Sequence, residues 1–194
     1  MSKRNVILVT DGDQVARSAV ELATSKIGGR CISESAGNPT PHTGEELIKM
    51  IKTAQHDPVV VMVDDRGRKG IGKGEQAMGA IIKDDGINIL GIVAVSSNGR
   101  DCNGVNVTCS ITNEGQVIEG GVDKYGNDIG EQVICGDTLS ILAGKPNITI
   151  VGIGDPGKMD YKDEILKGAP ITTMALEEIM KRSGYKHKRQ VFLL

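Results

Sequence analysis

Hydrophobic positions along the chain follow two patterns, short continuous runs and helical spacing, which alternate from the first residues onward. The run "NVILVT" is typical of a strand buried on both faces, and from Asp13 to Ile27 apolar residues then recur every three or four positions, as in an amphipathic helix. The same alternation returns along most of the chain. Buried strands are predicted at 5–10, 30–35, 59–63, 87–98 and 148–155.

Polar residues and glycines set the predicted helix boundaries. Thr43 and Glu46 have the spacing of a capping box, so a helix is expected to begin there. Another helix follows a glycine-rich loop and places apolar residues of 77–82 on one face. The last predicted helix begins at Pro170 and ends at Gly184.

Apolar strands separated by amphipathic helices predict an α/β fold with an open, doubly wound, mostly parallel sheet and helices on both faces, Rossmann- or flavodoxin-like. Residues 101–135 break this rhythm, and an appended β-hairpin is predicted around 105–120, with its turn at 113–115. The pattern then resumes with "GDTLSILAG". We expect one α/β domain over 1–184 and a C-terminal tail, basic and then apolar, over 185–194.

Composition and charge argue against some classes of function. The 194 residues carry 23 basic and 25 acidic side chains, a net charge of -2, and only 2% are aromatic. With neither a general positive field nor stacking surface for bases, we expect no nucleic-acid partner. The sequence shows no signal-type segment and no run of about 18 apolar residues, so we expect a soluble protein without a signal peptide or transmembrane segment.

The four cysteines contain no C-x-x-C pair, so the sequence does not support a zinc site or a redox pair. Cys31 and Cys135 have apolar surroundings in the sequence and are expected to be buried, reduced thiols.

Carboxylates follow the predicted strands. In an open α/β sheet the carboxyl ends of the strands meet at one edge, where ligands bind, so these side chains are expected to lie together. Clustered carboxylates favour a divalent cation with oxygen ligands, here Mg²⁺ or Ca²⁺. The alternative is that they cap helices and turns. The carboxylates are Asp11, Asp13, Asp64, Asp65 and Asp155.

The strand ends are also similar to the pattern of haloacid-dehalogenase-like phosphatases. That resemblance implies Asp11 as nucleophile and Asp13 as general acid and base, with Mg²⁺ held with the help of Asp155 and Asp160. A receiver-like pocket with Asp64 as phosphoacceptor uses many of the same residues. Candidate ligand-binding residues are Ser96, Ser97, Asn98 and Lys158, with Lys145 as a second candidate cation.

The stretch from Gly67 to Gly74 nearly matches a nucleotide-binding P-loop, with Gly74 where Ser or Thr is required. Without that hydroxyl, and with carboxylates directly before the loop, the match is interpreted as accidental. The loop is still a candidate contact for an anion or an acidic partner, since it carries Arg66, Arg68, Lys69 and Lys73. The tail, with basic residues over 181–189 and apolar ones over 191–194, is a candidate for peripheral membrane contact.

Longer strings carry a more specific resemblance, from about Val6 to Met180. They include "VILVTDGD", "GGRCISESAGNPT", "DPVVVMVDDRG", "GIVAVSSN", "GVDKYG", "IVGIGDPGKM" and "KGAPITTMALEEIM". Together these are similar to the soluble stage V sporulation protein AE family. The resemblance implies a member of the SpoVA group, which moves the calcium chelate of dipicolinic acid into the developing spore and out again on germination.

What the resemblance implies about function is a non-enzymatic accessory component at the spore inner membrane. Its expected partners are the other SpoVA proteins, with dipicolinate or its calcium chelate as a candidate ligand. No catalytic residues come with the family. The alternatives are a Mg²⁺-dependent phosphohydrolase built on Asp11 and Asp13, and a purely structural sporulation protein.

Overall fold

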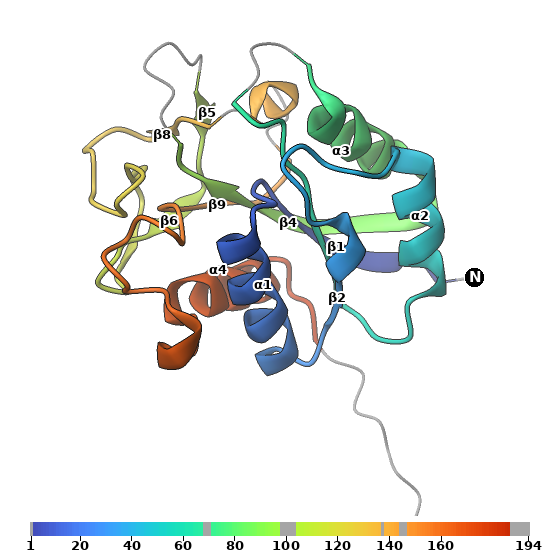
Figure 1. Cartoon of the computed structure of the whole chain (residues 1–194), viewed down its shortest axis with the longest axis horizontal. Helices are drawn as coiled ribbons and strands as arrows, with labels where there is room; N and C mark the ends of the chain where they lie inside the picture. The colour runs from blue at the N-terminus through green and yellow to red at the C-terminus, as the bar shows by residue number, and fades with distance from the viewer. Residues whose placement is uncertain (1, 68–70, 98–103, 137, 144–146, 187–194) are drawn as a thin grey trace, which may run out of the picture.

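The computed structural model describes residues 2–67, 71–97, 104–136, 138–143 and 147–186 (Figure 1). Its centre is a seven-stranded sheet in the order β2-β3-β1-β4-β9-β6-β7, in which every neighbouring pair is parallel except β6 and β7. The strands of this sheet are β1 (Arg4–Val9), β2 (Arg30–Ile32), β3 (Val59–Met62), β4 (Ile87–Val95), β6 (Cys109–Ile111), β7 (Val117–Ile118) and β9 (Ile150–Ile153).

Helices cover both faces of the sheet. On one face α1 (Gln14–Lys26) packs beside α4 (Pro170–Arg182), and on the other α2 (Gly44–Thr53) packs beside α3 (Lys73–Lys83) (Figure 1). Single 3-10 turns lie at Ser33–Ser35 (η1), Ser140–Leu142 (η2) and Ile165–Lys167 (η3). The predicted doubly wound, mostly parallel α/β fold is therefore confirmed.

The core consists of two apolar layers that share the strands. Successive residues of β1 point to opposite layers, so that Val6 and Leu8 pack toward α2 and α3, while Ile7 and Val9 pack toward α1 and α4. All four are essentially inaccessible to water. Burial on both faces explains why this strand is a continuous apolar run instead of an alternating one.

The capping chemistry of the helices follows the sequence closely. Thr43 and Glu46 form the predicted capping box at the start of α2. Helix α4 begins at Pro170 and is followed by Gly184 with φ +67°, close to the predicted end.

The predicted hairpin is confirmed at β6 and β7, and its first strand is shorter than predicted. Strands β6 and β7 pair antiparallel around residues 112–116, but β5 (Val105–Asn106) pairs with β8 (Val133–Ile134) in a separate two-stranded sheet. The chain changes partner between two neighbouring residues, because Val107 N–H donates to Gln132 O and Thr108 N–H donates to Ile150 O. One alternating stretch of sequence, residues 105–111, thus serves two sheets.

Cys31 and Cys109 are buried and free, whereas Cys135 is disulfide-bonded, so the expectation of a reduced thiol was wrong for Cys135. Cys135 lies just after β8, and its carbonyl accepts a hydrogen bond from Ser97 N–H at 2.8 Å. It therefore lies near the end of β4 and not inside an apolar layer.

Of the predicted tail, Tyr185 packs half-buried against the core, and residues 187–194 lie outside the described part of the chain.

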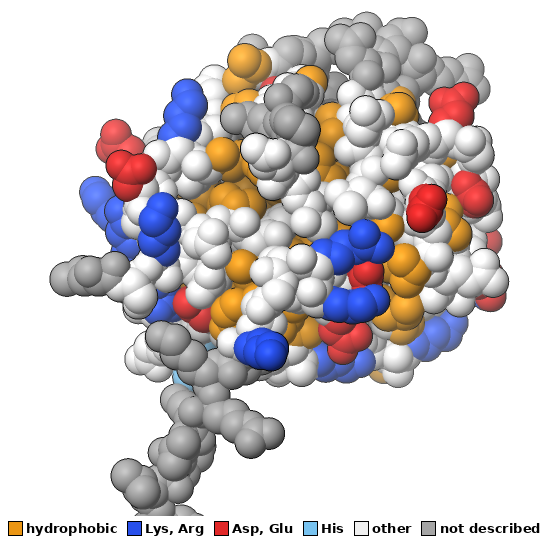
Figure 2. Space-filling view, turned by 180° about the vertical axis from the view of Figure 1, so that it is seen from behind, with side chains coloured by type: hydrophobic (Ala, Val, Ile, Leu, Met, Phe, Trp, Pro, Cys, Tyr) orange, Lys and Arg blue, Asp and Glu red, His pale blue; other side chains and the backbone are white. Residues whose placement is uncertain are grey.

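The surface carries both signs of charge. On the face shown in Figure 2, basic and acidic side chains are interspersed with hydrophobic ones, in keeping with the nearly balanced composition. No helix of the described residues is long and apolar enough to cross a membrane.

Candidate functional site

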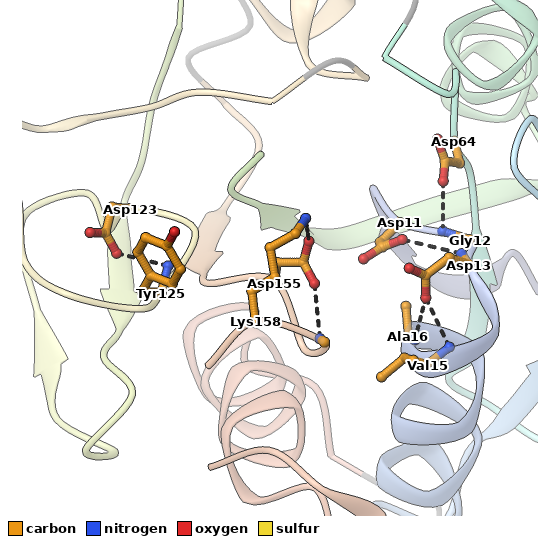
Figure 3. A network of polar contacts seen from close by, with 11 residues as sticks. Asp11, Gly12, Asp13, Val15, Ala16, Asp64, Asp123, Tyr125, Asp155 and Lys158 are labelled. Carbon is orange, nitrogen blue, oxygen red and sulfur yellow. Dashed lines mark hydrogen bonds and ion pairs between the residues drawn. The ribbon is translucent and has the colours of Figure 1, made fainter. Parts of the chain in front are cut away.

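Strand β1 ends at the middle of the sheet, and the carboxylates that follow it are held by the start of α1. Asp13 is the N-cap of α1, and its Oδ1 accepts hydrogen bonds from the N–H groups of Val15 at 2.8 Å and Ala16 at 2.9 Å (Figure 3). Asp11 Oδ1 accepts from the N–H of Asp13 at 3.2 Å. The capping interpretation therefore accounts for Asp13, while Asp11 keeps a carboxylate that is turned toward Asp155 (Figure 3).

Two carboxylates follow strand β3, and their side chains are directed to different parts of the structure. Asp64 accepts hydrogen bonds from Gly12 N–H at 3.3 Å and from Arg66 N–H at 2.7 Å, so it lies beside the β1 loop. Asp65 turns instead to α3 and accepts from the N–H groups of Gly74 and Glu75. Both side chains are buried, and both order the backbone around them.

The acidic edge, as we call Asp11, Asp13, Asp64 and Asp155, is completed by the end of β9. Asp155 Oδ1 accepts from Gly157 N–H at 2.9 Å, and its Oδ2 forms an ion pair with Lys158 Nζ (Figure 3). The backbone N–H of Asp155 donates to Lys124 O at 2.9 Å, which brings the 121–128 turn beside the same edge. Of the five predicted carboxylates, the structure gathers four and directs Asp65 elsewhere.

The acidic edge has unusual electrostatics at Asp11. Burial raises the pKa of Asp11 from 3.8 to about 8, and the neighbouring charges of Asp13, Asp155 and Asp64 act in the same direction, against the hydrogen bond from Asp13 N–H. The pKa of Lys158 is raised, first by its hydrogen bond to Asp155 and further by the charges of Asp155, Asp11 and Asp13. Lys158 is thus the internal counter-ion of the acidic edge.

The fit of a metal ion can be judged from the side-chain contacts. Within the described residues, no group of three or more Asp, Glu, His or Cys side chains is arranged to hold a metal ion. Asp13, Asp64 and Asp155 each already accept backbone hydrogen bonds, and the ammonium of Lys158 lies on Asp155. The arrangement is one of caps and an ion pair, and a preformed cage for Mg²⁺ or Ca²⁺ is not present in this part of the chain.

The predicted ligand-binding residues after β4 lie at the same edge. Ser96 is buried, and its N–H donates to Ile153 O at 2.9 Å, while Ser97 is half-buried beside β8. Asn98 lies outside the described residues, as does Lys145. Asp160, the other acidic residue of the phosphatase pattern, is exposed in the loop after β9.

Packing explains why Gly74 stands where a true P-loop has Ser or Thr. A Cβ at Gly74 would lie 2.7 Å from the backbone N and O of Asp64, so the Ser or Thr of a true P-loop does not fit there. The N–H groups at the start of α3, which would meet phosphate in a nucleotide site, donate to Asp65 instead. Arg66 and Lys73 line a hollow of about 250 Å³ with Pro39 and Asp65, and Arg68 and Lys69 lie outside the described residues.

Sequence reasoning missed three features. Asp163 is buried and caps α4 through the N–H groups of Ile171 and Thr172, although nothing but its position seven residues before Pro170 hints at this. The 121–128 turn lies beside Asp155, although its string "GVDKYG" at 121–126 gives no sign of that position. A hollow of about 440 Å³ beside the edge strand β2, lined in part by Arg30, Ile32 and His56, has no signal in the sequence.

The fold and the acidic edge together define an open-sheet α/β protein in which strand-end carboxylates lie around Lys158. Residues 5–183 match the family Stage V sporulation protein AE1, and the chain belongs to this family, as the resemblance indicated. Family membership makes it a sporulation-related protein. Searches of curated proteins and of solved structures give no match.

Proposed function

We propose that this protein is a non-enzymatic accessory component of the SpoVA group, acting at the face of the spore inner membrane in the uptake and germination-linked release of calcium dipicolinate. The single observation that carries the proposal is the family match over residues 5–183. The α/β domain would act as a docking module for the membrane proteins of the group.

The contacts at the acidic edge support a non-enzymatic role. Both oxygens of Asp64 accept hydrogen bonds from backbone N–H groups, and Oδ1 of Asp13 accepts two as the N-cap of α1. Asp155 is paired with Lys158. These hydrogen bonds order the loops that follow the strands, which is what a structural module requires.

One observation favours the phosphohydrolase as a second candidate. Asp11 follows β1, an interior strand of the sheet, and its carboxylate faces Asp155 and Lys158 (Figure 3). A phosphoryl acceptor at Asp11 would have to be ionised, whereas burial raises its pKa to about 8. Release of phosphate from a panel of phosphoesters by the purified protein, lost in Asp11→Asn, would establish this activity, and its absence from both would remove it.

Calcium and dipicolinate are the ligands to test first. Thermal unfolding is measured with Mg²⁺, with Ca²⁺, with dipicolinate, and with Ca²⁺ and dipicolinate together. A ligand that binds only the native state adds about 2.7 kcal/mol of stability at a hundredfold excess over its Kd. Lys158→Gln removes the internal counter-ion, so Ca²⁺ should stabilise this variant more than the unmodified protein. Lys83→Gln, an exposed lysine at the end of α3, is the matched control.

The docking role has its own test. The tagged full-length protein is isolated from spore membranes, and the other SpoVA proteins are identified in the eluate. Their recovery at a constant ratio supports the proposal. If the protein elutes without any of them, and no ligand shifts its unfolding, the accessory role is wrong.

A further inference from the structure

A hollow of about 440 Å³ lies beside β2, between this edge strand and the end of α2. Its floor is apolar, because Ile32 belongs to the core layer under α2 and α3, and Met50 and Ala54 pack against that layer. Arg30 and Glu34 belong to the polar part of the lining. The hollow is thus a place where an apolar core layer comes to the surface of the protein.

Strand β2 also has backbone groups without a strand partner. Among the described strands only β3 pairs with β2, so β2 forms one edge of the seven-stranded sheet. Arg30 N–H donates to Pro58 O at 2.9 Å, on the β3 side. Because successive residues of a strand direct their N–H and C=O groups to opposite sides, those of Cys31 are directed to the free edge. An extended segment laid along this edge can pair with Cys31 and place alternate side chains in the hollow.

The C-terminal end of the described chain comes close to this edge. Burial raises the pKa of Tyr185, and the charge of Asp57 raises it further while Arg4 acts in the opposite direction. The phenol therefore lies close to the ion pair of Arg4 and Asp57. Arg4 Nη2 also donates to the carbonyl of His56 at 3.0 Å, and His56 lines the hollow. The described chain thus ends near the hollow, beside the loop that joins α2 to β3 (Figure 1).

The segment that follows has the length and the composition to fill the hollow. Eight residues, 187–194, follow Lys186 in the sequence, and an extended chain of that length spans about 26–29 Å. Strand β2 has three residues and is about 10 Å long. Residues 191–194 are all apolar, and their Val and Phe favour strands. The charged side chains of the lining are one Arg and one Glu, so they carry no net charge that would repel the basic residues 188 and 189.

We propose that residues 190–194 dock on the free edge of β2 as an added strand and bury apolar side chains in the hollow. The added strand runs parallel to β2, because the segment arrives at the end of the sheet where β1, β2 and β3 begin. Its backbone pairs with Cys31. Phe192 lies on the floor at Ile32, and Leu194 follows on the same face, since side chains two residues apart in a strand share a face.

Docking in this way has a consequence for the tail. Its apolar residues cannot lie in the hollow and in a bilayer at the same time, so docking and the predicted membrane contact exclude each other. The inference concerns a different surface from the acidic edge and does not depend on the proposed function.

A fluorine label on Phe192 is the first experiment. This residue is the only phenylalanine of the chain, so the full-length protein labelled with 4-fluorophenylalanine gives a single fluorine resonance. In the docked state the resonance should be displaced from its position in the urea-unfolded protein, at every protein concentration. Thr53→Trp places a large ring at the hollow from the exposed end of α2 and should return the resonance to the unfolded position. Gln76→Trp, an exposed change in the first turn of α3, is the matched control and should leave the resonance displaced.

Hydrogen exchange measures the pairing with β2. The N–H of Cys31 should exchange at least tenfold faster in Phe192→Asp than in the unmodified protein, because a carboxylate on the apolar floor releases the segment. Phe192→Leu keeps an apolar side chain and should keep the slow exchange. Thermal unfolding shows that each variant is folded.

The proposal is wrong if the resonance of the unmodified protein stays at the unfolded position, or if Thr53→Trp leaves a displaced resonance unchanged. Equal exchange rates at Cys31 in the unmodified protein and in Phe192→Asp would also overturn it. A displacement that grows with protein concentration would assign the edge to the tail of a second copy. A displacement seen only with vesicles of phosphatidylcholine and phosphatidylglycerol would assign the segment to lipid. Either of these last two results excludes docking within one chain.

Discussion

Asp65 caps the N-terminus of α3 although it lies nine residues before Gly74 in the sequence. Its Oδ1 accepts a hydrogen bond from the backbone N–H of Gly74 at 2.7 Å. The N-cap residue of that helix is a glycine, which offers no side-chain acceptor of its own. A buried carboxylate at the end of β3 therefore does the work that Ser, Thr or Asp usually does locally.

We expect Asp65→Ala to lower the free energy of unfolding by about 1–2 kcal/mol, the usual cost of removing a cap, since two helix N–H groups lose their acceptor. Urea unfolding followed by circular dichroism measures the change. Asp85→Ala, at an exposed position on the turn after α3, should change it by less than about 0.5 kcal/mol. Equal effects of the two substitutions would show that the cap contributes nothing.

The second prediction concerns Gly74, which occupies the position of the Ser or Thr in a true P-loop. Gly74→Ser would complete the motif, but its Cβ would lie 2.7 Å from the backbone of Asp64. Overpacking of this kind costs about 1–3 kcal/mol, more than the gain of about 0.5 kcal/mol in helix propensity. We expect lower stability in urea and no binding of Mg²⁺-ATP by calorimetry. Gln76→Ala, an exposed change on the same helix, is the control, and nucleotide binding by Gly74→Ser would show that the loop is a latent P-loop.

Much of the fold was predictable because burial on both faces leaves a clear mark in the sequence. Strands such as β1 and β3 consist almost entirely of apolar residues, and the capping box of Thr43 and Glu46 fixes the start of α2. Short strands that share one run are not marked in this way. The change of partner between Val107 and Thr108 depends on contacts with Gln132 and Ile150, which no local pattern encodes.

The candidate site was predictable in location and not in detail. The rule that strand ends meet at one edge brought Asp11, Asp64 and Asp155 together correctly. Asp64 and Asp65 lie beyond the end of β3, where Asp65 is directed to α3 while Asp64 reaches the β1 loop. Turn geometry determines which carboxylate oxygens accept hydrogen bonds from backbone N–H groups. Those hydrogen bonds in turn determine whether the carboxylates act as caps or form a metal site.

The pH dependence of stability should report the environment of Asp11. Its pKa is about 8 in the native state, above the ordinary value of 3.8, so between these values the folded protein keeps a proton that the unfolded chain has lost. The contribution of Asp11 to stability therefore falls as pH rises from about 4 to about 8 and is constant above that.

The variant Asp11→Asn tests this, because its side chain cannot ionise and retains an oxygen for the N–H of Asp13. We expect the variant and the unmodified protein to have similar Tm values near pH 4. As the pH rises to 8, the variant should become progressively more stable than the unmodified protein. A difference in Tm that does not change with pH would show that Asp11 is ionised in the native protein. Repeating the series with millimolar Ca²⁺ then separates the causes, because a cation held by the ionised carboxylate would raise the Tm of the unmodified protein above pH 6 and leave that of Asp11→Asn unchanged.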